Sequence, residues 1–219
     1  ALSNRQFWSS APDQNSGNLV MDTAGLVVAM LILGYLLGSI SFAKLLTMRT
    51  GVDLFETGTG NPGAANVFRK VDKRIGALVF IADGLKGALP ISVAWAIGVS
   101  EDFWFVGGYA AVLGHWYPVF NRFKGGAGLA SGAGVAIALL PLPGLIGVTL
   151  GMLVIAKLKS SGHGALTGLI TILIAAALID ADWPLDAEWP AMAATVVLAL
   201  ILFGRAAARG WKPGRKDQD

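Results

Sequence analysis

Long apolar runs, separated by polar, glycine-rich or charged connections, dominate the chain. They lie at about residues 24–46, 75–97, 103–120, 128–140, 144–156, 165–179 and 190–204. A helix needs about 17–25 mostly apolar residues to cross a bilayer, and uninterrupted runs of this length favour spanning helices over strands. The first three runs are long enough, and the last two are when their flanks are added. The pattern therefore predicts an all-α polytopic membrane protein with about seven transmembrane helices.

The short runs at 128–140 and 144–156 leave two arrangements open. Pro141 and Pro143 lie between them, where proline favours a turn. The runs are either two short spanning helices or the two arms of a re-entrant hairpin. Both arrangements orient the rest of the chain in the same way. A chain that crosses the membrane twice and a chain that does not cross it both end on the side where they began.

Composition and charge placement support a membrane protein. Hydrophobic residues make up 54% of the chain and charged residues only 14%, against about 25% charged in an average soluble domain. Basic residues gather in segments 44–74, 122–124, 157–159 and 205–216, whereas the alternate connections, 101–102 and 180–188, are acidic. Because cytoplasmic connections carry the excess of lysine and arginine, the N-terminus is expected outside and the C-terminus inside.

Three regions follow from this pattern. They are a polar N-terminal extension at 1–23, a membrane domain at 24–204 and a basic cytoplasmic tail at 205–219. Within the membrane domain, Gly34 with Gly38 and Gly147 with Gly151 form small-xxx-small pairs, which are typical of close helix packing. The chain has no cysteine and only two histidines, so neither a thiolate site nor a multi-histidine metal site is expected.

The first glycine-rich segment runs from Gly58 to Arg69, and it is expected to lie wholly in the loop between the first two apolar runs. Glycine lets backbone N–H groups approach an anion closely, and arginine can bind a phosphate through two parallel hydrogen bonds. An ordinary flexible loop is the alternative. The candidate groups are the glycines Gly58, Gly60 and Gly63, the side chains of Thr59, Asn61 and Asn66, and the guanidinium of Arg69.

The second glycine-rich segment ends in Lys124, Gly125, Gly126, Ala127 and Gly128, directly before the fourth apolar run. A glycine loop that opens a helix presents free N–H groups and the positive end of the helix dipole, which suits an anion. The alternative is a helix-start loop in which the lysine only fixes the topology.

Two further features place polar groups within the apolar runs. Asp83 and Lys86 are three residues apart and therefore share a helix face, where they form either a structural ion pair or part of an interior cavity. His115 lies near the inner end of the third run, among aromatic residues. It is either a hydrogen-bonded structural residue or a contributor to a site.

Taken together, these residues resemble the bacterial acyl-phosphate:glycerol-3-phosphate acyltransferase family (the PlsY family), from about Leu33 to the last apolar run. Several blocks follow in the family's order. They are Gly38-Ser-Ile40, Gly51-Val-Asp-Leu54, Gly58 to Arg69, Asp83-Gly-Leu-Lys-Gly87, Gly114-His115 with Pro118-Val-Phe120, and Phe123-Lys-Gly-Gly126.

The resemblance implies a fold, a reaction and a location. Members are small seven-span enzymes of the bacterial cytoplasmic (inner) membrane. They transfer a fatty acyl group from acyl phosphate to the 1-hydroxyl of glycerol 3-phosphate and make lysophosphatidic acid for phospholipid synthesis. They use neither coenzyme A nor acyl carrier protein, and no cofactor or metal is expected. The expected partners are membrane lipids and the two substrates, with no nucleic acid.

The resemblance also implies roles for individual residues. Thr59, Arg69 and Lys124 are the expected catalytic residues. Further residues are expected to bind substrate and its phosphate groups, namely Ser39, Gly58, Gly60, Asn61, Gly63, Asn66, Lys86, His115, Gly125, Gly126 and Gly128.

Several positions depart from the family pattern. Thr59 stands where the family has a serine, Ala65 where it has a threonine, and Ala127 where it has a second phosphate-binding lysine. The family's histidine and asparagine after the last span are missing from segment 204–210. Two hypotheses therefore remain open. The chain is an active acyltransferase, or it is a catalytically weak relative that serves as an accessory subunit of a membrane complex, held through residues 1–23.

Overall fold

The computed structural model describes residues 23–158, 160–179 and 189–208, and every regular element among them is helical. This confirms the predicted all-α class for the described part of the chain. The described residues divide into two compact units, which meet between residues 135 and 136 of the chain, and the first of them is named the 11–135 unit below.

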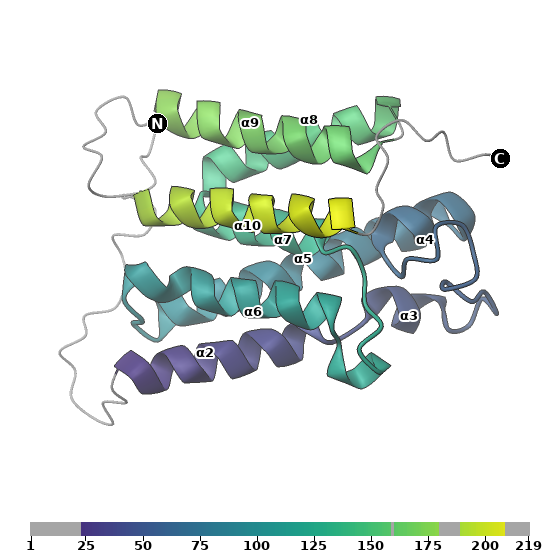
Figure 1. The fold of residues 1–219 in the computed structure, drawn as a ribbon, viewed down its shortest axis with the longest axis horizontal. Coiled ribbons are helices and arrows are strands. Elements are labelled where there is room, and N and C mark those ends of the chain that lie inside the picture. Colours follow the sequence, from purple (N-terminus) through teal and green to yellow (C-terminus); the bar gives the residue numbers. More distant parts are fainter. Residues whose placement is uncertain (1–22, 159, 180–188, 209–219) are drawn as a thin grey trace. The chain divides into compact units, whose positions relative to one another are not determined.

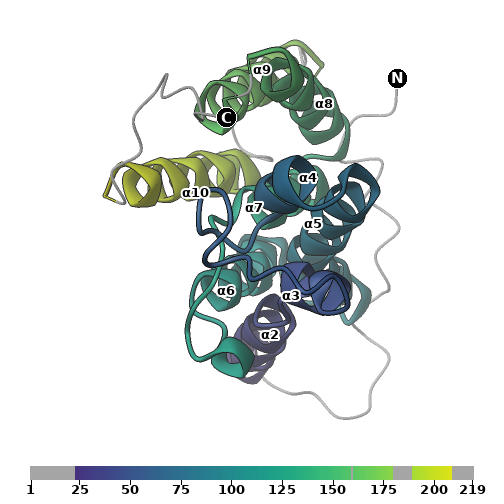
Figure 2. The same cartoon turned by 90° about the vertical axis from the view of Figure 1, so that its right-hand side faces the viewer.

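The 11–135 unit is built on three helices that lie side by side, α2 (Thr23–Gly38), α5 (Lys73–Ala96) and α6 (Trp104–Trp116) (Figures 1 and 2). Two short helices, α3 (Phe42–Thr47) and α4 (Ala64–Lys70), connect α2 to α5. The 3₁₀ turns η1 (Glu101–Phe103) and η2 (Val119–Asn121) flank α6, and α7 (Leu129–Leu139) begins in this unit.

Small residues bring α2 and α6 into close contact. A Cβ atom at Gly34 would collide with the carbonyl oxygen of Gly107, and one at Gly38 with that of Ala111. The backbones approach this closely only because neither α2 position carries a side chain. The helix-packing interpretation of this glycine pair is therefore confirmed.

The second unit contains α8 (Pro141–Leu158), α9 (Ser161–Ile179) and α10 (Trp189–Ala208). Helices α8 and α9 pack against each other through Gly147 and Gly151 on one side and Gly164 and Gly168 on the other. The packing interpretation of the second glycine pair is confirmed as well.

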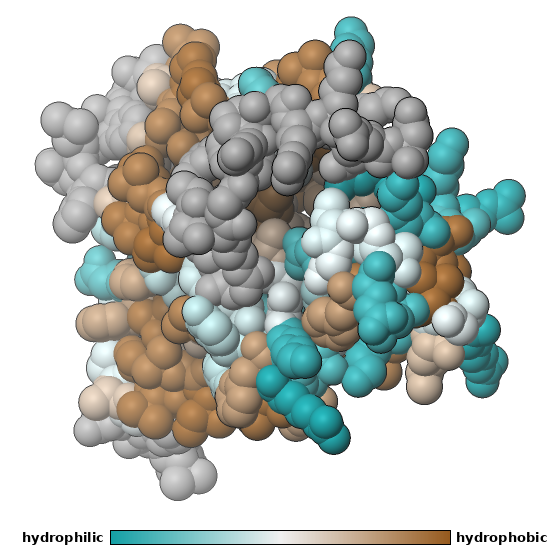
Figure 3. Space-filling model, turned by 45° about the vertical axis from the view of Figure 1, so that its right-hand side comes forward, coloured by the Kyte–Doolittle hydropathy of each residue, from teal (hydrophilic) through white to brown (hydrophobic). Residues whose placement is uncertain are grey.

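Four helical segments are long and apolar enough to cross a bilayer. They are Thr23–Thr47, Lys73–Ala96, Pro141–Leu158 and Ser161–Ile179. Leu129–Leu139 and Pro190–Leu202 are apolar but shorter. Figure 3 shows broad apolar areas on the visible face, with hydrophilic side chains concentrated toward its right-hand side. The length and composition of the described helices thus support a polytopic membrane protein, while the count of seven spans stays a prediction.

Two predicted boundaries are wrong in detail. The third run, expected to span from 103 to 120, forms a helix of only 13 residues, Trp104–Trp116, because Pro118 disfavours helical backbone in the residue before it. The turn expected at Pro141 and Pro143 is reduced to Leu140, and both prolines lie in the first turn of α8. Proline is tolerated there because the first N–H groups of a helix need no partner within it.

Charged connections separate to the two ends of the 11–135 unit. The acidic turn η1 joins α5 to α6 at one end, whereas α3, α4 and the segment after α6 lie at the other (Figure 1). The basic connections 44–74 and 122–124 therefore share one end of this unit, as the alternation of charge predicts.

Candidate functional site

The site forms where the first apolar run is interrupted between α2 and α3. Ser39 is fully buried, and its hydroxyl donates to the Tyr35 carbonyl oxygen at 2.8 Å. The backbone N–H of Val119 donates to the same hydroxyl oxygen at 3.4 Å. The Lys86 ammonium donates to the Ile40 carbonyl oxygen at 2.8 Å. The Lys86 ammonium thus satisfies the Ile40 carbonyl group at the break, and the Ser39 hydroxyl joins the end of α2 to the segment after α6.

A buried ion pair on α5 supports this break. The Lys86 Nζ atom lies 2.8 Å from Oδ1 of Asp83, and the two side chains are only 3% and 2% exposed. The Nδ1 atom of His115 lies 3.7 Å from the same carboxylate oxygen. Of the two alternatives left open by the sequence, the ion pair is formed, and both of its side chains also line the pocket described below. The pair also joins α5 to the α2–α3 break and brings it next to the end of α6.

Gly125 and Gly126 pass directly over His115. The Gly126 N–H donates to the His115 carbonyl oxygen at 3.1 Å. A Cβ atom at Gly126 would collide with Nε2 of the imidazole, and one at Gly125 would collide with the His115 carbonyl oxygen. Glycine is required at both positions by this close approach. The indole N–H of Trp116 holds the following residue by donating to the Ala127 carbonyl oxygen at 2.9 Å.

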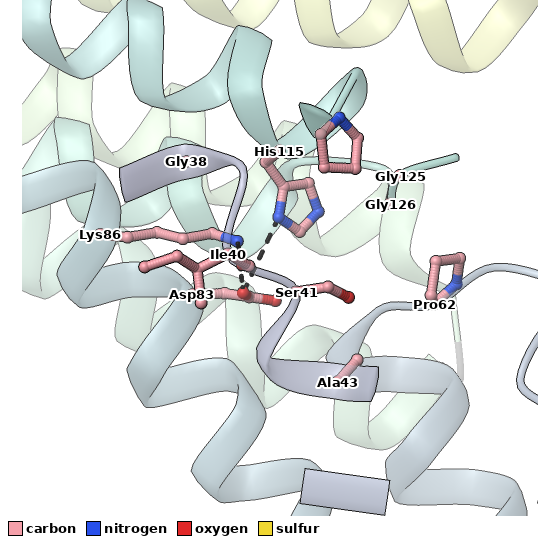
Figure 4. Close-up of a pocket in the computed structure, with 11 residues that line it drawn as sticks. Gly38, Ile40, Ser41, Ala43, Pro62, Asp83, Lys86, His115, Gly125 and Gly126 are labelled. Carbon is pink, nitrogen blue, oxygen red and sulfur yellow. Dashed lines mark hydrogen bonds and ion pairs between the residues drawn. The ribbon is translucent and has the colours of Figure 1, made fainter. Parts of the chain in front are cut away.

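These groups surround a small pocket (Figure 4). Its lining combines an ammonium, an imidazole and a carboxylate with glycine backbone. The Lys86 ammonium has three N–H donors, and it contacts Asp83 and the Ile40 carbonyl oxygen, so one donor remains for an anion. Four predicted site residues meet here, Lys86, His115, Gly125 and Gly126. The remaining lining residues are Gly38, Ile40, Ser41, Ala43, Pro62, Asp83 and Pro118.

The first glycine-rich segment is organised by Asn66. Its buried side-chain amide donates to the carbonyl oxygens of Thr57 at 2.9 Å and Leu54 at 3.3 Å, and accepts from the Thr59 N–H at 3.2 Å. In this structure Asn66 therefore shapes the loop. The expectation that the whole segment is a loop is wrong, because its second half is helix α4. Beyond the segment, Asp72 caps the next helix by accepting from two N–H groups at the start of α5.

The three expected catalytic residues do not line the pocket. Thr59, Arg69 and Lys124 are exposed, on the segment before α4, on α4 itself and on the segment before α7, respectively. These segments lie at the end of the unit that holds α3 and α4 (Figure 1).

The other predicted residues are placed as follows. Gly58 and Gly60 have positive φ values of 63° and 67°, and Gly63 precedes α4 as its N-cap. The Oδ1 atom of Asn61 is buried without a hydrogen bond. Gly128, with a φ of 89°, directly precedes α7, so the second glycine-rich segment opens a helix as predicted.

Asp83 lines the pocket but is not among the residues predicted to bind substrate. Its charge within an apolar run and its spacing from Lys86 are the sequence features that could have indicated it. The role of the Ile40 carbonyl group could not be predicted from the sequence, because it becomes a partner of Lys86 only through the packing of α5 against the α2–α3 break. Among the described residues, no group of three or more His, Cys, Asp or Glu side chains is arranged to hold a metal ion.

Comparison with known proteins assigns the family. The family model described as glycerol-3-phosphate acyltransferase matches residues 28–209. The chain belongs to this glycerol-3-phosphate acyltransferase family. The glycerol-3-phosphate acyltransferase of Geotalea daltonii is 38% identical over 170 residues, which cover 78% of this chain and 88% of that relative.

Two solved structures have the same fold as this family member. A crystal structure of PlsY, an integral membrane glycerol 3-phosphate acyltransferase in its glycerol 3-phosphate form, is 33% identical with a TM-score of 0.70. The match covers 84% of this chain and 89% of that one. The lysophosphatidic acid form is 32% identical with a TM-score of 0.64, over 85% and 93% of the two chains. The resemblance to the PlsY family in the sequence is thereby confirmed.

Proposed function

We propose that this protein is a membrane acyltransferase that moves a fatty acyl group from acyl phosphate to the 1-hydroxyl of glycerol 3-phosphate. The observation that carries the proposal is the family match over residues 28–209. The pocket supports it, because its lining includes the Lys86 ammonium, a group that suits a phosphate. The reaction needs no cofactor, because acyl phosphate is already an activated donor.

The proposed step is a direct acyl transfer. The glycerol hydroxyl oxygen attacks the carbonyl carbon of the mixed anhydride, the bond from that carbon to the phosphate oxygen breaks, and inorganic phosphate leaves. The hydroxyl proton passes to the departing phosphate or to water. Positioning of the two substrates and stabilisation of the developing negative charge then supply most of the acceleration.

Residue roles in this proposal fall into two groups. Thr59, Arg69 and Lys124 contact phosphate groups from the connections, and they reach the substrates when these are bound. The groups already at the pocket are Lys86, His115, Gly125 and Gly126, with Ser39 behind them. The loop glycines Gly58, Gly60, Gly63 and Gly128 and the amides of Asn61 and Asn66 shape the phosphate-binding backbone.

Arg69→Ala should reduce acyl transfer more than Arg74→Ala does. Both arginines are exposed, but only Arg69 closes the glycine-rich segment. A lost hydrogen bond between charged groups costs about 1.5–3 kcal/mol, so a loss of roughly ten- to hundredfold in kcat/KM is expected at Arg69. Steady-state kinetics of both variants measure the difference. Equal, small losses would refute the role of Arg69.

Ala127→Lys should raise the rate with acyl phosphate by roughly ten- to hundredfold, since it restores a positive charge worth about 1.5–3 kcal/mol to a bound phosphate. Ala127 directly follows the two pocket glycines and is partly exposed, so the backbone position is already in place. Ala127→Gln is the control that adds a polar side chain without the charge. Equal rates in wild type, Ala127→Lys and Ala127→Gln would contradict the phosphate-binding role of this position.

The proposal includes a topology and a location. Seven helices cross the cytoplasmic membrane of a bacterium, with the N-terminus outside and the C-terminus inside. Residues 24–204 form the membrane domain between a polar extension at 1–23 and a basic cytoplasmic tail at 205–219. The separation of acidic and basic connections within the 11–135 unit supports this orientation.

Single cysteines should be labelled from opposite sides of the membrane at Asp53 and Ser100. Both residues are exposed. Asp53 lies on the connection between α3 and α4, and Ser100 directly precedes η1, and these two connections are at opposite ends of the 11–135 unit (Figure 1). The absence of native cysteine removes background labelling. A membrane-impermeant maleimide added to sealed, right-side-out vesicles is expected to label Ser100→Cys but not Asp53→Cys. Labelling of both from the same side would overturn the topology.

The relatives reported above are described as acyltransferases, so the accessory-subunit alternative gains no support from them. Donor choice tests the proposed reaction. Purified protein is given labelled glycerol 3-phosphate with either acyl phosphate or acyl coenzyme A. Transfer from acyl phosphate alone is the expected result, and transfer from acyl coenzyme A alone would refute the proposed donor.

A further inference from the structure

The turn that follows α6 exposes apolar side chains next to the end of α2. Phe120 and Phe123 are 65% and 59% exposed, and Val119 between Pro118 and Phe120 is 41% exposed. The turn is held against α2, because the Tyr35 hydroxyl donates to the Tyr117 carbonyl oxygen at 2.8 Å. Figure 1 shows it projecting sideways from the unit, below the right-hand end of α6.

Hydrogen bonds fix the shape of this turn. The N–H groups of Asn121 and Phe123 donate to the Pro118 carbonyl oxygen at 3.1 and 2.9 Å. The Asn121 side chain donates to the Lys124 carbonyl oxygen at 2.7 Å and accepts from the Lys44 ammonium at 2.9 Å. Because these bonds define the backbone, the two phenylalanines are held outward rather than left to collapse onto the protein.

The backbone of the turn is also unusual. Arg122 and Phe123 have positive φ values of 52° and 61°, a conformation that residues other than glycine rarely adopt. Two such residues in succession persist only where the surrounding structure holds them. The turn therefore presents Phe120 and Phe123 in a defined conformation.

The charge around the turn indicates what covers it. Arg122, Lys124 and the neighbouring Lys44 are exposed, and segment 117–128 contains no Asp or Glu. Aromatic rings beside basic side chains suit the boundary between lipid headgroups and acyl chains, most of all in an anionic leaflet. The adjacent helix α2 exposes Val28, Ile32 and Leu36, which suits contact with lipid.

We infer that residues 118–124 form an interface anchor, in which Phe120 and Phe123 insert into an anionic leaflet and Arg122 contacts lipid phosphates. Pro118, the first residue of this anchor, and Gly125, which directly follows it, both line the pocket. The anchor thus sets the level of the pocket relative to the headgroups. This inference does not depend on the reaction proposed for the pocket.

Spin labels test the insertion. Phe120→Cys and Phe123→Cys are made in the cysteine-free chain, labelled with a nitroxide and placed in nanodiscs of phosphatidylcholine and phosphatidylglycerol. Val28→Cys is the lipid-exposed reference, and Glu56→Cys, exposed on the connection between α3 and α4, is the aqueous one. Both turn labels should collide several-fold more with oxygen, relative to a water-soluble nickel complex, than the label at Glu56. A ratio like that of Glu56 at both turn positions would overturn the anchor.

The contribution of charge is tested with Arg122→Gln in the Phe120→Cys background. In the parent, the oxygen-to-nickel ratio should rise when phosphatidylglycerol is added to phosphatidylcholine, and Arg122→Gln should abolish most of that rise. A parent label that does not respond to anionic lipid, or an undiminished rise in Arg122→Gln, would overturn the proposed contact of Arg122 with lipid phosphates.

Discussion

Lys86→Met is expected to lower the free energy of unfolding by about 3–5 kcal/mol, because it leaves the buried Asp83 carboxyl group without its partner. The ammonium lies 2.8 Å from that carboxylate and 2.8 Å from the Ile40 carbonyl oxygen. The ion pair and the hydrogen bond to the α2–α3 break are therefore lost together. Thermal unfolding in detergent, followed by tryptophan fluorescence, measures the change.

The double variant Asp83→Asn/Lys86→Met is the control for this prediction. It removes both charges and should be more stable than Lys86→Met alone, because no uncompensated buried carboxylate remains. A single variant that unfolds at the wild-type temperature, or a double variant less stable than the single one, would contradict the structural role assigned to the pair.

Gly126→Ala should abolish most of the activity and lower stability by about 1–3 kcal/mol, the usual cost of forcing an extra carbon into a packed site. The added Cβ would collide with Nε2 of His115. The imidazole has little room to move away, because its other nitrogen faces the Asp83 carboxylate at 3.7 Å. Activity and unfolding temperature of the purified variant are measured together.

Gly84→Ala is the matched control, since it adds the same carbon on α5 next to Asp83. Its Cβ would lie 3.6 Å from the Ala130 carbonyl oxygen, an ordinary contact, and alanine favours a helix. This variant should unfold at or above the wild-type temperature. If Gly126→Ala behaves like Gly84→Ala in both measurements, the close approach of the glycine loop to His115 is not what the site requires.

Much of the fold was predictable because the bilayer constrains it strongly. Long apolar runs, glycine pairs and alternating charge each report a physical requirement of a membrane helix. They located the long helices and the packing faces of α2 and α8, whereas the partner helices α6 and α9 came from the structure. The Asp83–Lys86 pair was visible for the same reason, since two charges one turn apart within an apolar run need each other.

The details that depend on tertiary contacts were not predictable. The first apolar run reads as one continuous helix, yet it is interrupted at Ser39–Ser41, where the Ser39 hydroxyl and the Lys86 ammonium satisfy backbone groups. The first glycine-rich segment suggested an anion-binding loop. Its asparagine at 66 instead bonds the loop's own backbone, and its end folds into α4.

The most direct test of the proposed function is the stoichiometry of the complete reaction. Purified protein in nanodiscs is given acyl phosphate and labelled glycerol 3-phosphate, and lysophosphatidic acid and inorganic phosphate are measured together, above a control without protein. We expect the two products to form in equal amounts and to require both substrates. Folded protein that yields no labelled lysophosphatidic acid, or that releases phosphate whether or not glycerol 3-phosphate is present, would contradict the assignment as an acyltransferase.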